Sequence, residues 1–211
     1  MMKMMAIFVA ILICFTGCAK MRAAGWYSDY GITREDLGKK ESIPALIRAL
    51  RDRNLYVRIY SARELGKFGE NAKTAITGLF ATLSSPTPQL RMESLHSLSL
   101  IGLEGHKEKL PFLSKFLRDS NSGVRLYASS AVATLGEDAL STAPLLMALS
   151  DDEHPKVRRE AMLALYKVNY REQDFRVKLE NIKNHDENIF NRATAEELLA
   201  KLNNTSQKTG L

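Results

Sequence analysis

The stretch Val124–Gly136, VRLYASSAVATLG, decides the fold because its pattern occurs five times in the chain. The copies are Val57–Gly69 (VRIYSARELGKFG), Leu90–Gly102 (LRMESLHSLSLIG), Val124–Gly136, Val157–Asn169 (VRREAMLALYKVN) and Asn191–Asn203 (NRATAEELLAKLN). The second residue of every copy is an arginine, and successive arginines are 33, 34, 33 and 34 residues apart. A period of this size indicates a stacked array of one supersecondary unit.

Each copy reads as an amphipathic helix. The first, fifth, ninth and twelfth residues are mostly apolar or small and fall on one stripe at about 100° per residue. The fifth residue is always small, which lets a neighbouring helix approach closely; it is Ser61, Ser94, Ala128, Ala161 or Ala195. Glycine or asparagine, which tolerate the left-handed conformation, ends every copy. The predicted helix ends are Gly69, Gly102, Gly136, Asn169 and Asn203.

A shorter segment of apolar periodicity precedes each copy. These segments are Ile43–Leu50, Ala75–Leu83, Leu110–Leu117, Ala143–Leu149 and Phe175–Ile182. Asp, Asn, Ser and Pro, which favour turns, separate each of them from the following helix. The sequence therefore predicts an all-α protein, an α-solenoid of about five antiparallel helical hairpins over residues 32–203.

The repeated motifs resemble those of HEAT repeats. The pattern V-R-x-x-A-x-x-x-L-G-x-x-G follows a turn with Asp or Asn, and I-P-x-L-x-x-x-L precedes that turn. The pattern is most similar to the short HEAT-like, or phycobilisome-lyase-type, variety. This resemblance implies a right-handed superhelix whose second helices line the concave side. It also implies a protein that binds other proteins, since only some members are enzymes.

The N-terminal residues predict export and a lipid anchor. Residues 1–17 read as a signal peptide, because Lys3 precedes the apolar run Ala6–Phe15, which is too short to cross a bilayer. The sequence Phe15-Thr16-Gly17-Cys18 resembles the lipobox of bacterial lipoproteins, which implies lipidation of Cys18. With Ala19 next, the resemblance implies the outer membrane, facing the periplasm. An ordinary secretory signal or an uncleaved anchor are the alternatives.

Two short segments flank the array. Residues 18–31 form a tether, in which Trp26, Tyr27 and Tyr30 lie either at the membrane interface or over the exposed end of the first hairpin. Residues 32–38 read as a truncated capping helix, with Thr33 and Asp36 spaced like a capping box. The polar residues 204–211 are expected to form a disordered tail.

Composition limits the partners. The formal net charge is +6, from 30 Lys and Arg against 24 Asp and Glu, and the charges are spread along the chain. A net positive charge favours anionic partners. The chain has no run of like-charged residues, and we do not expect nucleic acid as a partner. Of the two cysteines, Cys14 leaves with the signal peptide, so the mature chain forms no internal disulfide.

The recurring arginines are interpreted as structural. An aspartate precedes four of the five by about six residues, and Ser85 takes that place in the second repeat. The resemblance to HEAT-like arrays implies a ladder of Asp–Arg pairs between the turns of neighbouring repeats, and bidentate pairing suits it. Its members are Asp52, Arg58, Arg91, Asp119, Arg125, Asp152, Arg158, Asp186 and Arg192.

The sequence offers no pattern for catalysis. Deoxyhypusine hydroxylase, a HEAT-like enzyme, binds iron through His-Glu dipeptides, but His96, His106, His154 and His185 are each followed by another residue. Motifs for a nucleophile elbow, a phosphate loop, a zinc protease and a dinucleotide fold are lacking. We therefore expect no catalytic residue, metal site, cofactor or small-molecule substrate.

The concave side is the candidate binding surface. Apolar side chains occupy positions there that water would normally cover, and basic ones flank them, as in many protein-binding grooves. The candidates are Ile59, Tyr60, Arg63, Met92, His96, Leu126, Tyr127, Arg159 and Leu163. Curvature of the stack could instead bury the apolar ones between repeats.

These features together predict a non-enzymatic, membrane-tethered scaffold in the bacterial cell envelope that binds a protein of unknown identity. An enzyme, or an enzyme subunit of the phycobilin-lyase-like family, is the alternative. A third alternative is a structural protein that associates with itself.

Overall fold

The computed structural model describes residues 25–171 and 173–209, where all regular structure is helical. The first helices of the five hairpins are α2 (Ile43–Ala49), α4 (Ile76–Thr82), α6 (Leu110–Leu113) with the 3-10 turn η5 (Ser114–Arg118), α8 (Ala143–Leu149) and α10 (Gln173–His185). The second helices are α3 (Leu55–Lys67), α5 (Pro88–Ile101), α7 (Ser122–Ala133), α9 (Pro155–Lys167) and α11 (Ile189–Thr209). Shorter 3-10 segments are η1 (Trp26–Tyr30), η2 (Lys40–Ser42), η3 (Gly69–Ala75), η4 (Lys107–Lys109) and η6 (Gly136–Thr142).

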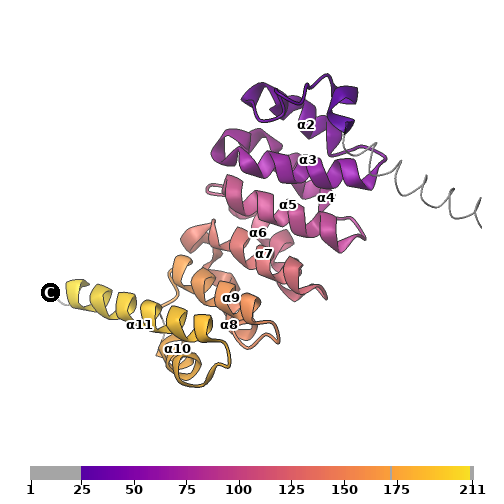
Figure 1. Ribbon diagram of the computed structural model, residues 1–211. Coiled ribbons are helices and arrows are strands. Elements are labelled where there is room, and N and C mark those ends of the chain that lie inside the picture. Colours follow the sequence, from indigo (N-terminus) through magenta and orange to yellow (C-terminus); the bar gives the residue numbers. More distant parts are fainter. Residues whose placement is uncertain (1–24, 172, 210–211) are drawn as a thin grey trace, which may run out of the picture.

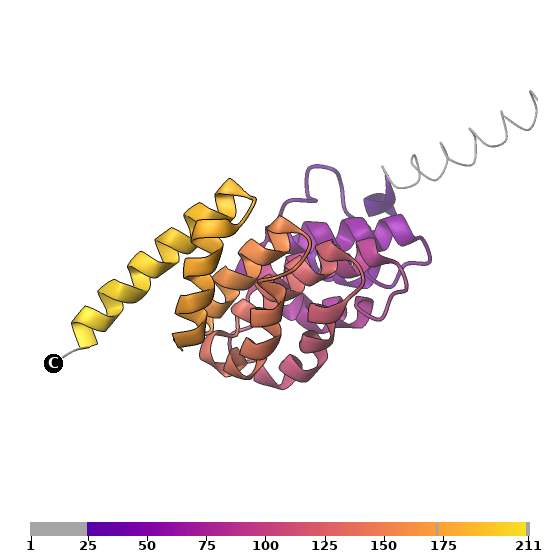
Figure 2. The same ribbon diagram turned by 90° about the horizontal axis from the view of Figure 1, so that it is seen from below.

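The hairpins stack into an α-solenoid. The helices α3, α5, α7 and α9 lie side by side in sequence order, with α4, α6 and α8 in a layer behind them (Figure 1). Since each second helix packs against the next one, the molecule has two layers and one continuous core. At the C-terminal end, α11 packs on α10 and projects away from the array (Figures 1 and 2).

Helix ends follow the predicted punctuation in four of the five repeats. Gly69, Gly102, Gly136 and Asn169 have φ values of 51°, 84°, 57° and 63°, in the left-handed range that glycine and asparagine tolerate best. At the other end, the side chains of Asn54 and Asn121 accept hydrogen bonds from backbone N–H groups of the first turns of α3 and α7. These local signals fix where each helix begins and ends.

The predicted stripe lies in the core. Its fifth position is completely buried in every repeat, and the small side chain there lets adjacent second helices approach closely. The residues are Ser61, Ser94, Ala128, Ala161 and Ala195. The ninth position is also buried throughout, at Leu65, Leu98, Val132, Leu165 and Leu199.

The C-terminal helix is longer than predicted. It continues past Asn203 to Thr209, so residues 204–209 extend α11 in place of the predicted disordered tail. Asn203 does not end the helix, since asparagine permits the left-handed conformation without requiring it, and its side-chain oxygen accepts a hydrogen bond from Arg176 Nη1 at 2.8 Å. The first residue that strongly disfavours a helix after this point is Gly210.

The N-terminal end also differs from the prediction. Residues 34–38 form a turn in which the N–H groups of Asp36 and Leu37 both donate to Thr33 O, and no regular helix continues from it. A single turn seldom propagates, because its nucleation is costly. Tyr27 and Tyr30 are half-buried against the core, so they cover part of the first hairpin. The predicted signal peptide and Cys18 lie outside the described residues.

None of the helices in the described part of the chain is both long and apolar enough to span a bilayer.

Candidate functional site

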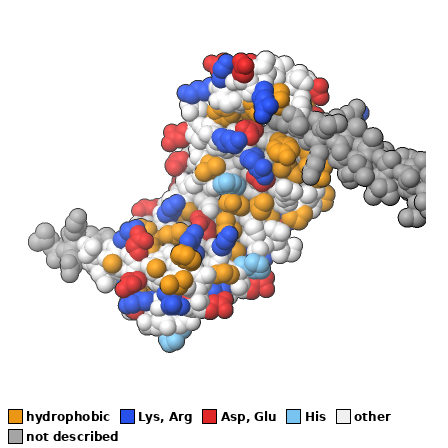
Figure 3. Space-filling model, viewed as in Figure 1, with side chains coloured by type: hydrophobic (Ala, Val, Ile, Leu, Met, Phe, Trp, Pro, Cys, Tyr) orange, Lys and Arg blue, Asp and Glu red, His pale blue; other side chains and the backbone are white. Residues whose placement is uncertain are grey.

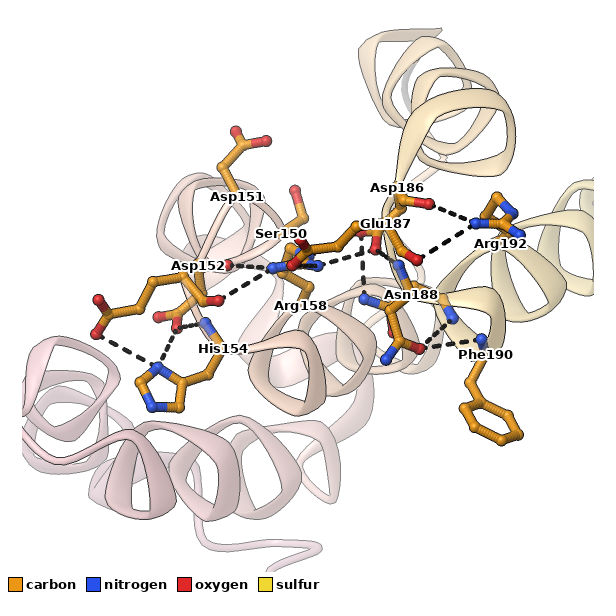
Figure 4. Close-up of polar contacts among 12 residues, drawn as sticks. Ser150, Asp151, Asp152, His154, Arg158, Asp186, Glu187, Asn188, Phe190 and Arg192 are labelled. Atoms are coloured by element: carbon orange, nitrogen blue, oxygen red, sulfur yellow. Dashed lines mark hydrogen bonds and ion pairs between the residues drawn. The ribbon is translucent and has the colours of Figure 1, made fainter.

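Three of the recurring arginines bind the aspartate of the following repeat with two hydrogen bonds each. Nε and Nη2 of the arginine donate to the two carboxylate oxygens, the fork geometry that suits a carboxylate best. The distances are 3.0 and 3.0 Å for Arg91–Asp119, 2.7 and 3.0 Å for Arg125–Asp152, and 2.7 and 2.8 Å for Arg158–Asp186. Figure 4 shows the last pair between two successive turns.

The same arginines also hold their own turns together. Nη1 of Arg125, for example, donates to the carbonyl oxygens of Asp119 and Ser120 at 2.9 and 3.1 Å. The Arg125 side chain is only 12% exposed and its partner Asp152 only 6%. Each guanidinium therefore joins two turns of adjacent repeats and is unavailable to a ligand, so these pairs are structural.

The two ends of the ladder differ from the predicted pattern. Arg58 and Arg192 bind only carbonyl oxygens of their own turns, and in the described residues neither has a carboxylate partner. Asp52 accepts a hydrogen bond from Tyr30 Oη at 2.7 Å in place of one from an arginine. Burial together with the Asp52 carboxylate raises the pKa of Tyr30 to about 12. Tyr30 therefore remains a hydrogen-bond donor and closes the N-terminal end of the ladder.

Two of the ladder aspartates, Asp152 and Asp186, have lowered pKa values. Burial alone would raise the pKa of Asp152, but hydrogen bonds from Arg125 and from the His154 N–H outweigh it and hold the pKa below its ordinary value. The pKa of Asp186 is lowered too, because bonds from Arg158 and from the Asn188 N–H outweigh its burial. Both carboxylates therefore stabilise the folded state at neutral pH.

A second row of contacts joins the second helices. It links the seventh residue of one repeated stretch to the fourth residue of the next. Arg63 donates to Glu93 at 2.5 and 3.2 Å, and Ser130 Oγ donates to Glu160 at 2.7 Å. The rings of His96 and Tyr127 stack with centroids 4.3 Å apart. Arg63, His96 and Tyr127, all predicted to meet a partner, thus make contacts within the array.

The sequence reasoning did not single out Glu93 and Glu160. Each is the fourth residue of its repeated stretch, and that shared position was the available signal. The partners lie 30 residues away, on the preceding second helix. Their pairing therefore becomes evident only when the register of the stacked helices is known.

The apolar candidates on the second helices divide into two groups. Ile59 is only 3% exposed and belongs to the core of the stacked helices, so its prediction as a binding residue is wrong. Met92 lies directly against Gly123, where an added Cβ would come within 2.7 Å of Met92 Sδ. Leu126 and Leu163 are half-buried, whereas Tyr60 is 38% exposed. In the N-terminal half of this surface, Ile59 and Met92 are therefore occupied by contacts within the array, whereas Tyr60 stays exposed.

Two open hollows lie in the C-terminal half. The Leu126 hollow, of about 360 Å³, is lined by Ser122, Gly123, Leu126, His154, Pro155, Lys156 and Val157. The Phe190 hollow, of about 320 Å³, is lined by Pro155, Lys156, Arg159, Asn188, Phe190 and Asn191. One lies between α7 and α9 and the other between α9 and α11, so they are equivalent places one repeat apart. Phe190 is 66% exposed, and its ring points away from the ladder contacts (Figure 4).

Two cationic side chains, Lys156 and Arg159, border these hollows. In the part of the chain that the structure describes, neither Lys156 nor Arg159 has a hydrogen-bond or ion-pair partner. Of the neighbouring acids, Glu187 pairs with Arg158 at 3.3 Å and Glu153 with Arg125 at 3.5 Å, while Glu160 accepts a hydrogen bond from the uncharged Ser130. Figure 3 shows hydrophobic side chains among Lys, Arg, Asp and Glu over the C-terminal part of the array. We call the surface that holds both hollows, with Leu126, Lys156, Arg159 and Phe190, the second-helix face.

Among the described residues, no group of three or more His, Cys, Asp or Glu side chains lies together in a way that could hold a metal ion.

The family of the chain follows from its repeats. The family model for HEAT repeats matches residues 43–132, 76–166 and 110–200, three overlapping windows that span the stacked hairpins. The chain belongs to the HEAT-repeat family. A comparison with curated proteins finds no match.

Solved structures share this HEAT-repeat architecture at low sequence identity. The complex of CpcE and CpcF of phycocyanin lyase from Nostoc sp. PCC7120 has 19% identity and a TM-score of 0.56, covering 75% of this chain and 98% of that one. An archaeal HEAT-like repeat protein from Thermococcus onnurineus NA1 has 15% identity and a TM-score of 0.58, covering 81% and 73%. A designed armadillo repeat protein in complex with the peptide (KR)4 has 18% identity and a TM-score of 0.61, covering 80% and 90%. These likenesses establish the fold.

Proposed function

We propose that this HEAT-repeat protein is a scaffold whose second-helix face binds an acidic segment of another protein. The observation that carries the proposal is the pair of equivalent hollows beside two cations that have no partner in the described residues. An apolar hollow accepts a side chain, and a free cation beside it selects an anionic neighbour. Because the hollow and its neighbouring cation occur on successive repeats, they suit recognition of a chain that runs along the array.

The spacing of the hollows suggests the form of this segment. Packed helices lie about 8–10 Å apart, so equivalent places on neighbouring repeats are separated by about that distance. A chain in the extended polyproline II conformation rises about 3.1 Å per residue and makes one turn every three residues, so side chains three apart lie on one face and match this spacing. We infer an extended segment with large apolar side chains at every third residue and Asp or Glu between them.

The charge of the expected partner is opposite to that of one structural neighbour's ligand. The designed armadillo repeat protein was solved with the basic peptide (KR)4. Here Lys156 and Arg159 border the hollows, and like charges facing each other would oppose binding of a basic peptide. Charge therefore distinguishes this proposal from simple analogy to that neighbour.

Leu126→Glu is expected to weaken binding of an acidic peptide at least about tenfold. The new carboxylate removes an apolar contact from the hollow and repels the glutamates of the peptide. The probe is a labelled peptide in which leucine recurs at every third residue with glutamates between, and fluorescence anisotropy measures its dissociation constant. Arg159→Glu is expected to act in the same direction through charge alone.

Leu140→Glu is the matched control for Leu126→Glu. Leu140 is 45% exposed on η6, away from both hollows, so the same change there is expected to leave peptide binding unaltered. Thermal unfolding of each variant verifies that it is folded. The proposal would be contradicted if a peptide with lysine in place of glutamate bound as tightly as the acidic peptide. It would also be contradicted if Leu126→Glu and Leu140→Glu weakened binding equally.

In this proposal the chain acts by binding and not by catalysis. Apolar and basic side chains border the hollows together with Ser122, His154, Asn188 and Asn191, and the proposal assigns all of them to recognition by shape, charge and hydrogen bonding. The alternative of a phycobilin-lyase-like enzyme rests on the fold shared with the phycocyanin lyase complex. Crosslinking in the native cell, followed by mass spectrometry, identifies the partner and tests whether it is a protein.

We further propose that the array is tethered to the bacterial envelope, at the periplasmic side of the outer membrane, through a lipid on Cys18. The support is the N-terminal sequence, in which Phe15-Thr16-Gly17-Cys18 resembles a lipobox. Cys18→Ala is expected to shift the protein from the membrane fraction to the soluble fraction and to abolish labelling by a fatty-acid analogue. Retention in the membrane with labelling unchanged would rule out this anchor.

A further inference from the structure

Arg58 uses only half of its guanidinium. Like the ladder arginines of the later repeats, it donates from Nη1 to two carbonyls of its own turn, Asp52 O at 2.6 Å and Arg53 O at 3.1 Å. In Arg91, Arg125 and Arg158, the other edge, Nε and Nη2, binds an aspartate of the next repeat. Within the described residues this edge of Arg58 has no partner.

The cause is a single residue. Asp119, Asp152 and Asp186 each precede the following arginine by six residues, and Ser85 stands at the same place before Arg91. Ser85 reproduces part of the aspartate's role, because its Oγ accepts a hydrogen bond from the Thr87 N–H at 3.2 Å, as Asp119 Oδ1 does from Asn121 at 2.9 Å. It supplies no carboxylate for the preceding arginine.

An open hollow of about 320 Å³ lies beside Arg58 and Ser85, at the place where an aspartate in the position of Ser85 would bring its carboxylate. It lies at the turns between the first and second helices, and its lining includes Arg51, Arg58, Ser85, Pro86 and Leu90. No acidic side chain lines it, and two arginines do. The Thr82 hydroxyl in its wall is already engaged with Leu79 O and Ser94 Oγ. The hollow thus offers an arginine fork, positive charge and an apolar wall.

We propose that this hollow is a binding site for an external carboxylate, which takes the place that an aspartate occupies in the following three repeats. A planar carboxylate matches the fork of Nε and Nη2, as the three ladder pairs of the same molecule demonstrate. Arg51 adds a second positive charge, and Leu90 can contact the carbons that bear the carboxylate. The site is separate from the second-helix face and does not depend on the function proposed for that face.

The Nε–H signal of Arg58 in a ¹⁵N-labelled sample provides a direct test. On titration with sodium acetate, at an ionic strength held constant with chloride, this signal is expected to shift saturably. The Nε–H signals of Arg91, Arg125 and Arg158 are internal controls and are expected to remain still, because their carboxylate partners are already in place. Arg58→Lys, which keeps the charge but lacks the fork, identifies the signal by its loss.

Further ligands distinguish the source of the carboxylate. Aspartate blocked at both ends represents a side chain of a partner protein, acetate a free carboxylate, and inorganic phosphate an unrelated anion. Tighter binding of blocked aspartate than of acetate supports a protein source, and equal binding supports any carboxylate, both within the proposal. Tighter binding of phosphate than of either would overturn the assignment to a carboxylate.

Ser85→Asp supplies the missing carboxylate from the chain itself. In this variant the chemical shift of the Arg58 Nε–H is expected to approach those of the other ladder arginines and to stop responding to acetate. The midpoint of thermal unfolding is expected to rise. Ser85→Asn, which has the same shape without charge, is the matched control and is expected to keep the response. An Arg58 signal in the wild-type protein that moves no more than those of the other three arginines would refute the site.

Discussion

Arg125→Ala is expected to lower the free energy of unfolding by about 3 kcal/mol, because it leaves the carboxylate of Asp152 buried without its partner. The Asp152 side chain is only 6% exposed and accepts two hydrogen bonds from the guanidinium. Removing one partner of such a pair is costly because the remaining charge stays desolvated. Chemical denaturation monitored by circular dichroism measures the change.

Arg58→Ala is the matched control, because the two arginines differ in one respect. Both donate from Nη1 to two carbonyls of their own turn, at 2.6 and 3.1 Å for Arg58 and at 2.9 and 3.1 Å for Arg125. Only Arg125 also binds a carboxylate. The difference between the variants therefore isolates the pair that crosses between repeats, and equal losses would show that the carbonyl contacts alone account for the stability.

The pH dependence provides a second readout of this pair. The pKa of Asp152 is lowered in the folded protein, so its contribution is complete above its ordinary value of 3.8 and is lost as the pH falls below that value. The difference in unfolding free energy between the wild-type protein and Arg125→Ala is accordingly expected to shrink at acid pH. A difference that stays constant from neutral pH down to about 3 would contradict the assignment to an ionised pair.

Phe175→Ala is expected to cost about 3–4 kcal/mol, and the loss is expected to fall mainly on the C-terminal hairpin. Phe175 is completely buried in α10, whose main packing partner is α11. In a solenoid each repeat contacts only its neighbours, so a cavity in the terminal repeat loosens that repeat first. Hydrogen exchange is expected to accelerate in α10 and α11 while α3 and α5 stay protected.

Leu98→Ala serves as the internal comparison. Leu98 is also completely buried, but it lies in α5, which packs against both α3 and α7. A cavity of similar cost there is expected to reduce protection on both sides of α5. A uniform loss of protection across all helices in Phe175→Ala would instead show that the array unfolds as one cooperative unit.

The prediction of the hairpins succeeded because its signals are local. Spacing of apolar residues, small fifth residues and glycine or asparagine at helix ends act within one or two helical turns. They placed Gly69, Gly102 and Gly136 at helix ends, where the structure has left-handed backbone. The end at Asn203 failed because asparagine only permits a left-handed residue, and here its side chain binds Arg176 instead.

The candidate binding surface was less predictable, because exposure depends on what the neighbouring repeat brings. Ile59 and Leu126 hold the same position in their repeated stretches, yet Ile59 is buried and Leu126 borders an open hollow. Arg63 and His96 also share one position, but Arg63 meets a carboxylate on the next helix and His96 an aromatic ring. Helical position alone could not separate these cases.

The sequence by itself determined the repeating unit, its number of copies, the ends of most helices and the stripe that enters the core. The tertiary structure alone decided which side chains pair between repeats, which apolar residues stay open to a partner, and that the second edge of Arg58 has no carboxylate within the described residues. The physical reason is distance along the chain. Helix formation depends on residues three or four apart, whereas the inter-repeat pairs join residues 27 to 31 positions apart, and only stacking brings them together.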